Sequence, residues 1–195
     1  MSTHQHLLFQ TLCLRHEFPA TEFEKFIPLF QKRHLEKNEM LFQESDVVRS
    51  LAFVMQGALR QFQRTAEGIE RNIFFAEEGW WGGEMDSFIN QVPSTMSMQA
   101  LEDCELLTLD RERWEYATRN FPDYALYQIK NRGRTVAWLK NLLSNMSTDT
   151  PDEKYRRVLK ENPHWINRFS QYHIASYLGI TPETLSRIRK RNIHL

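Results

Sequence analysis

Cysteine is scarce in this sequence, and its scarcity excludes several classes of protein. Only Cys13 and Cys104 occur among the 195 residues. An iron–sulfur cluster of the usual kind needs four thiolates, so two cysteines exclude it. Small secreted domains held by disulfides have many more cysteines, so we expect both thiols to be reduced in a cytoplasmic protein. The simplest interpretation of each is an isolated buried cysteine.

Long apolar runs are also missing. Hydrophobic residues make up 41% of the chain, which is enough for a core. No run reaches the roughly 18 apolar residues that a membrane-spanning helix needs, so we expect no membrane partner. Residues 1–10 lack the basic and long apolar segments of a secretory signal, which again predicts a cytoplasmic location.

The chain has no net charge, but its charges are unevenly distributed. From Pro151 onward there are nine basic and four acidic side chains, a balance of +5. The preceding residues have 16 basic and 21 acidic side chains, a balance of −5. A basic C-terminal segment would be attracted to the phosphates of DNA, although chance clustering is the alternative explanation.

The end of this basic segment predicts two short helices joined by a tight turn. Ser170 is suited to cap the first helix, and Gly179 to take the left-handed conformation that ends it. Thr181 and Pro182 then begin the second helix, because a hydroxyl caps well and proline is tolerated in the first turn. This pattern is typical of a DNA-binding helix-turn-helix, and an amphipathic hairpin in an ordinary helical bundle is the alternative.

The outer face of the second helix has the chemistry that reads duplex DNA. A helix fits the major groove, where Arg187 can donate to guanine and Glu183 can accept from the amino group of cytosine. Other polar and basic side chains on this face can reach phosphates. The predicted DNA interface comprises Thr181, Pro182, Glu183, Thr184, Ser186, Arg187, Arg189 and Lys190. The predicted partner is double-stranded DNA.

Residues from about 31 to 110 contain many short strands separated by turn signals. Such strands at this spacing predict a β-sandwich or jelly roll. The expected strands are Glu39–Phe42, Ser50–Met55, Ala58–Arg64, Glu70–Phe75, Ser97–Leu101 and Glu105–Leu109.

Histidine is missing where a jelly-roll enzyme would need it. Metal enzymes of the cupin kind hold their metal with two or three strand histidines and a carboxylate. None of the seven histidines lies between Met40 and Asp110, so we expect no metal site. The sequence also has no serine–histidine–acid set and no glycine loop that cradles phosphate. We therefore predict that the protein is not an enzyme, with a cupin-like enzyme as the rival interpretation.

An apolar seam lies between the strands and the basic segment. Pro122 and Asp123 suit the first turn of a long helix. Further along, positions alternate in steps of three and four residues, as in a coiled coil. These positions are Ile129, Arg132, Val136, Leu139, Leu143 and Met146. A seam of this kind can pair with the same helix of a second subunit, and the alternative is that the helix packs this stripe on its own sandwich.

Several of these motifs resemble the cyclic-AMP receptor / fumarate-nitrate regulator (Crp/Fnr) family of bacterial transcription factors. The helix-turn-helix resemblance rests on Ile174-Ala175-x-x-Leu178-Gly179-Ile180-Thr181-x-Glu183-Thr184-Leu185-Ser186-Arg187. Val54-Met55-x-Gly57 and Trp81-Gly82-Gly83-Glu84 resemble motifs of the family's cyclic-nucleotide-binding domain.

The resemblance implies an α+β fold in three parts. These are a jelly-roll, cyclic-nucleotide-binding-like domain at residues 1–120, a dimerisation helix at 121–148 and a small all-α helix-turn-helix domain at 149–195. It also implies a dimeric, sequence-specific regulator that binds DNA and has RNA polymerase as a further partner. By resemblance, Glu183 and Arg187 contact bases.

The ligand cassette departs from the family pattern. The resemblance implies that a Gly-Glu pair binds ribose and that an arginine followed by a hydroxyl residue binds phosphate. Gly83 and Glu84 match the first pair, but Ser94 and Thr95 put serine where the arginine should be. Losing that charge-assisted bond costs roughly 1.5–3 kcal/mol or more. We therefore expect no cyclic-nucleotide cofactor and no response to cyclic AMP, with another effector or none.

Several aromatic residues lie near the cassette in the sequence. The aromatic residues near the cassette are expected to fill the barrel core, and the alternative is that they roof a small pocket. These residues are Phe74, Phe75, Trp80, Trp81 and Phe88.

Pro182 replaces the usual first arginine of the recognition helix, so the family's DNA site need not carry over. Only four residues follow Arg191, so we expect no β-wing. The second rival function is a small-ligand sensor without a DNA role.

Overall fold

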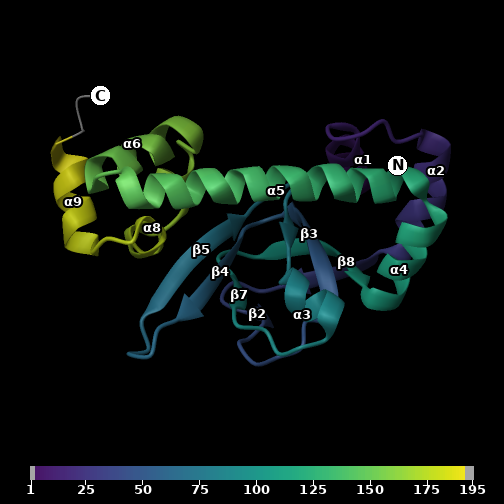
Figure 1. The fold of residues 1–195 in the computed structure, drawn as a ribbon, viewed down its shortest axis with the longest axis horizontal. Coiled ribbons are helices and arrows are strands. Elements are labelled where there is room, and N and C mark those ends of the chain that lie inside the picture. The colour runs from purple at the N-terminus through teal and green to yellow at the C-terminus, as the bar shows by residue number, and fades with distance from the viewer. Residues whose placement is uncertain (1–2, 192–195) are drawn as a thin grey trace. The chain divides into compact units, whose positions relative to one another are not determined.

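The computed structural model describes residues 3–191, and the side chains of residues 6–145 and 148–191. Its strands form two four-stranded sheets, with the orders β1-β8-β3-β6 and β2-β7-β4-β5 (Figure 1). The strands are β1 (Gln31–Leu35), β2 (Met40–Phe42), β3 (Ser50–Gln56), β4 (Leu59–Arg64), β5 (Glu70–Ala76), β6 (Trp81–Gly82), β7 (Ser97–Ala100) and β8 (Cys104–Asp110). All six predicted strands are present within one or two residues.

The central pair β3 and β8 is apolar along nearly its whole length. It is antiparallel, with Leu51 opposite Leu109 and Phe53 opposite Leu107. Five consecutive residues of β3 are buried, because both faces of this strand are covered. The structure adds β1 and β6 to the predicted strands. Strand β1 is mostly polar and exposed, so it lacks the apolar alternation that marks a strand in a sequence.

Aromatic packing joins the first helices to the start of the long helix. Helix α2 (Ala20–Phe26) is followed by the 3₁₀ helix η1 (Ile27–Leu29), and α1 (Thr3–Cys13) precedes them. The ring of Phe26 lies 4.7 Å from that of Tyr124 and 5.5 Å from that of Phe121, measured between centroids. Such tilted aromatic pairs add to the burial of apolar area, so they anchor the first turns of the long helix.

The remaining helices follow the strands or connect them. They are α3 (Met85–Asn90), α4 (Arg111–Asn120), α5 (Pro122–Thr148), α6 (Pro151–Glu161), α7 (Trp165–Arg168), α8 (Gln171–Leu178) and α9 (Pro182–Arg191). An antiparallel β core, a long helix and a group of C-terminal helices confirm the predicted α+β fold class. None of the helices in the described part of the chain combines the length and the hydropathy needed to cross a membrane.

The chain divides into two compact units, each described separately. One comprises residues 1–63 and 75–134, and the other comprises residues 64–74 and 135–195. Helix α5 continues from the first unit into the second without a break (Figure 1). The second unit therefore contains the end of α5, helices α6 to α9 and the tip of the β4–β5 hairpin.

The two cysteines are free thiols in different environments. Cys104 is buried, and its Sγ lies 3.1 Å from the carbonyl oxygen of Glu102. This confirms the prediction of an isolated buried cysteine at that position. The same prediction is wrong for Cys13, because the last residue of α1 is exposed.

Candidate nucleic-acid interface and ligand cassette

Local capping determines where the two helices of the helix-turn-helix begin and end. Ser170 Oγ accepts a hydrogen bond from the backbone N–H of His173 at 3.2 Å. Gly179 ends α8 with φ 68°, the left-handed conformation that glycine adopts readily. Thr181 Oγ1 accepts from the N–H of Thr184 at 3.2 Å, and α9 begins at Pro182. The predicted caps are all confirmed.

The apolar side of α9 packs inward and leaves its polar side accessible. Leu185 and Ile188 are buried, as are Ala175 and Leu178 of α8. The eight residues of the predicted interface lie on α9 or at its N-terminal cap. Thr181, Pro182, Glu183, Arg187 and Lys190 are exposed, and Thr184, Ser186 and Arg189 are partly exposed. The structure therefore brings this set together on an accessible face.

Hydrogen bonds among these residues order the start of α9. Arg187 Nη2 donates to Thr184 Oγ1 at 3.3 Å. Hydrogen bonds from its own backbone N–H and from the Thr181 hydroxyl hold the pKa of Glu183 below its usual value. Glu183 is therefore ionised at neutral pH, which makes it a stronger acceptor for a group such as the amino group of cytosine. Arg191, the last residue of α9, pairs with Asp152 at 2.9 Å.

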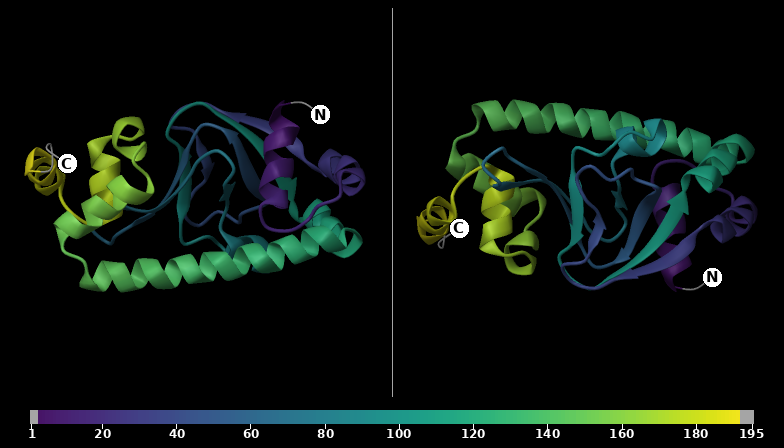
Figure 2. Two further views of the ribbon diagram at one scale, coloured as in Figure 1. Left: turned by 90° about the horizontal axis from the view of Figure 1, so that it is seen from above. Right: turned by 90° about the horizontal axis from the view of Figure 1, so that it is seen from below.

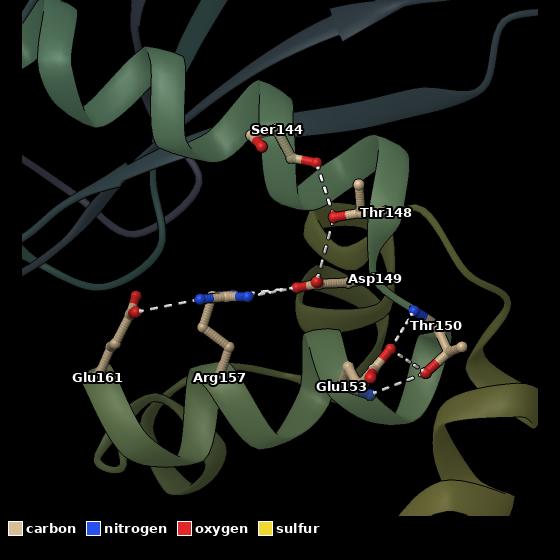
Figure 3. A network of polar contacts seen from close by, with 7 residues as sticks. All are labelled: Ser144, Thr148, Asp149, Thr150, Glu153, Arg157 and Glu161. Carbon is tan, nitrogen blue, oxygen red and sulfur yellow. Dashed lines mark hydrogen bonds and ion pairs between the residues drawn. The ribbon is translucent and has the colours of Figure 1, made fainter.

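A polar network fixes the direction in which α6 leaves α5 (Figure 3). Asp149 Oδ2 accepts from Arg157 Nε at 3.1 Å and from Nη2 at 2.6 Å. Thr150 caps α6 in a capping box, since its N–H donates to Glu153 while its hydroxyl accepts from the Glu153 N–H. Helix α6 contacts α8 and α9, so these bonds also help to position the helix-turn-helix. Nothing in the sequence indicated the Asp149–Arg157 pair.

The seam of α5 is exposed in the single chain. Ile129, Val136 and Leu143 are 66%, 57% and 67% exposed, and Leu139 is 40% exposed. These four side chains of the predicted seam are therefore accessible in the single chain. The guanidinium of Arg132 lies 5.9 Å from the ring centre of Trp114. The side chain of Met146 is outside the described residues.

The ligand cassette uses its carboxylate for local structure. Glu84 caps α3, because its Oε1 accepts from the N–H of Asp86 and its Oε2 from that of Ser87, each at 3.0 Å. Gly83 has φ 147°, and a Cβ there would lie 2.8 Å from a methyl carbon of Leu51. The backbone at this point therefore requires glycine.

The second half of the cassette is tied to the loop before β3. The backbone N–H of Ser94 donates to Asp46 and its carbonyl accepts from Ser45, each at 2.8 Å. Ser94 is buried, and its hydroxyl donates to the carbonyl of Met96 at 2.9 Å. The side chain of Thr95 is exposed. Ser94, which the resemblance places at the family's arginine position, is thus a buried residue whose hydroxyl is bonded locally.

Arg60 of β4 is a cation that could in principle replace the missing arginine of the cassette. The structure buries this residue and directs its Nε and Nη2 to Gln99 Oε1, at 2.9 and 2.6 Å. Its guanidinium also lies 4.0 Å from the ring centre of Phe62. Arg60 is thus committed to the β4–β7 pair. A cleft of about 350 Å³ includes no cassette residue in its lining, but one lining residue, Asp46, accepts the backbone hydrogen bond of Ser94. The lining is Arg33, Leu41, Phe42, Asp46, Val47, Val48, Arg49 and Ser50.

Most aromatic residues near the cassette fill the core, as predicted. Phe75 and Phe88 are buried. Trp81 packs on Phe53, and its indole N–H donates to the Tyr127 hydroxyl at 2.9 Å. The prediction is wrong for Trp80, which is 46% exposed. Among the described residues, no three His, Cys, Asp or Glu side chains gather where they could hold a metal ion.

Comparison with known proteins agrees with this architecture. Residues 32–120 match the family model of the cyclic nucleotide-binding domain. The fold resembles the catabolite activator protein of Thermus thermophilus at 24% identity and a TM-score of 0.61, covering 94% of this chain and 86% of that one. It resembles the global regulator CLP of Xanthomonas campestris, described as responsive to c-di-GMP, at 18% identity and a TM-score of 0.71, covering 90% and 92%. No curated protein sequence matches the chain.

A third solved structure, FixK2 of Bradyrhizobium japonicum, matches at 17% identity and a TM-score of 0.70, with 83% of each chain covered. The chain therefore has a cyclic nucleotide-binding domain, and most of its length has the fold of Crp/Fnr regulators. The predicted resemblance is confirmed at the level of domain and fold.

Proposed function

We propose that the protein is a homodimeric, sequence-specific DNA-binding transcription regulator of the Crp/Fnr type. The observation that carries this proposal is the exposed polar face of α9, opposite a buried side that packs on α8. A recognition helix presents this arrangement to the major groove. Such a regulator would act on DNA in the cytoplasm, with RNA polymerase as a further partner, and would not be an enzyme.

The exposed seam of α5 supports the homodimer. Apolar side chains that repeat every three and four residues and face water are the usual basis of a paired helix. A two-fold dimer would present two copies of α9 to two half-sites about one helical turn of DNA apart.

The cassette supports a regulator that does not respond to cyclic AMP. A cyclic nucleotide brings one phosphate charge, and a bound phosphate without a paired cation loses its strongest contact. Ser94 offers only a hydroxyl, which already bonds to Met96. Glu84 already bonds to the start of α3. A different effector, or none, would therefore control the protein.

The experiment that tests DNA binding measures affinity for a mixed-sequence duplex as a function of salt. Each phosphate contact contributes about 0.9 to the slope of log affinity against log salt. The double substitution Arg189→Ala with Lys190→Ala should therefore make the slope of log affinity against log salt shallower by about 1.8. The matched control, Arg111→Ala with Arg119→Ala, removes two positive charges from α4 and should leave the slope unchanged. An equal decrease in both variants, or no binding by the wild type, would contradict the proposed interface.

A further inference from the structure

Strand β5 is the edge strand of its sheet, so one side has no partner strand. The backbone N–H and C=O groups on the outer side of an edge strand can pair with another chain unless something within the protein covers them. In a strand, the backbone N–H and C=O groups of residues two positions apart point to the same side. The N–H of Asn72 and the carbonyl of Glu70 therefore face in the same direction.

One hydroxyl of the helix-turn-helix satisfies both of these edge groups. Ser176 Oγ on α8 accepts from the N–H of Asn72 at 2.9 Å and donates to the carbonyl of Glu70 at 2.9 Å. It thus takes the place of the neighbouring strand that β5 lacks. Figures 1 and 2 show this strand running beside α8.

Side chains on one face of β5 extend the contact. Asn72 is only 4% exposed, and its Nδ2 donates to the carbonyl of His173 at 3.1 Å and lies 3.3 Å from the ring Nδ1 of His173. His173 and Ser176 are three residues apart and therefore lie on one face of α8. Two residues beyond Asn72, the ring of Phe74 packs on Trp138 of α5 at 5.7 Å. The hairpin tip thus contacts both α8 and α5.

We propose that the edge of β5 is a docking site for the helix-turn-helix, with Ser176 and Asn72 as residues that position the recognition helix. This inference rests on the proposed DNA-binding function. Neither residue belongs to the polar face of α9, so both act through α8, which contacts α9. The hairpin belongs to the cyclic nucleotide-binding domain by sequence, so this contact links that domain to DNA recognition.

Hydrogen exchange of the Asn72 backbone amide tests the docking without DNA. In the wild type this amide should be protected, because its acceptor is Ser176 Oγ. Ser176→Ala should speed its exchange at least about tenfold, since the hydroxyl is its acceptor. Ser176→Thr keeps a hydroxyl and should restore protection. Gln63→Ala removes an exposed amide from the same hairpin and is the matched control.

DNA affinity tests the positioning. Ser176→Ala and Asn72→Asp, whose carboxylate cannot donate to His173, should each weaken duplex binding at least about threefold, while Gln63→Ala leaves it unchanged. Rapid exchange of the Asn72 amide in the wild type, or unchanged protection in Ser176→Ala, would overturn the docking. Lost protection with unchanged affinity would overturn the positioning role. If the wild type binds no duplex, the proposed function is wrong, and the exchange data still decide whether the hairpin docks.

Discussion

Substituting Val136 and Leu139 with aspartate should convert the proposed dimer into monomers. Fully burying a valine or leucine side chain contributes about 1.5–3 kcal/mol. Val136 is 57% and Leu139 40% exposed in the single chain. Their exposed fractions add up to about one whole side chain that a partner helix could bury in each protomer. Burying it would stabilise the dimer by ~2 kcal/mol per protomer, or ~4 kcal/mol for the symmetric dimer.

The double substitution removes this contribution and places four carboxylates in the seam. Desolvation and mutual repulsion of those charges add to the loss. The dissociation constant of the dimer should therefore rise by at least about a thousandfold, which corresponds to roughly 4 kcal/mol.

Sedimentation velocity over a range of protein concentrations measures this change. Ala137→Asp with Asn141→Asp is the matched control, because it adds two carboxylates at exposed positions of α5 outside the seam. The control should remain dimeric. Dimers that persist in the Val136→Asp, Leu139→Asp variant would refute the reasoning and show that the subunits pair elsewhere.

Three further predictions test individual residues. Arg187→Ala should weaken specific DNA binding by roughly 1–3 kcal/mol and relax the sequence preference at one base position of the DNA site. An unchanged base preference at every position in a binding assay would exclude a role of Arg187 in base recognition. Thr150→Ala should lower the free energy of unfolding by about 1 kcal/mol at pH 7 in urea titrations. Because the Thr150 hydroxyl holds the pKa of Glu153 below its usual value, the bond to the ionised Glu153 stabilises the fold above that usual value. The difference between wild type and variant should shrink as pH falls through the lowered pKa, and a difference that stays constant into strong acid would argue against this pairing. Cyclic AMP should leave the thermal unfolding midpoint of the wild type unchanged, and a rise of several degrees would show that the cassette binds it despite Ser94.

Local chemistry explains why much of the fold could be predicted from the sequence. Ser170, Gly179 and Thr181 act within one helical turn, so the residues that determine each cap are close together in the chain. Most buried strands, such as β3 and β8, were equally predictable, because they show apolar runs bounded by turn residues. Strand β1 was missed because its polar residues face solvent.

Contacts between distant residues were not predictable in the same way. Ser176 and Asn72 are 104 positions apart, and a serine in a short helix gives no sign that it will meet a strand edge. Asp149 and Arg157 are common residue types that become a pair only when α6 turns back from α5. For the cassette, the missing arginine was visible in the sequence, but the capping role of Glu84 depends on the three-dimensional path of the chain.

The most direct test of the proposed function is selection of bound sequences from a random duplex library at low and at moderate salt. We predict an inverted repeat whose half-sites lie about one helical turn apart and which is still recovered at moderate salt. A pool without a shared motif, whose retention disappears steeply as salt rises, would contradict the account, because it would reveal only attraction to phosphates.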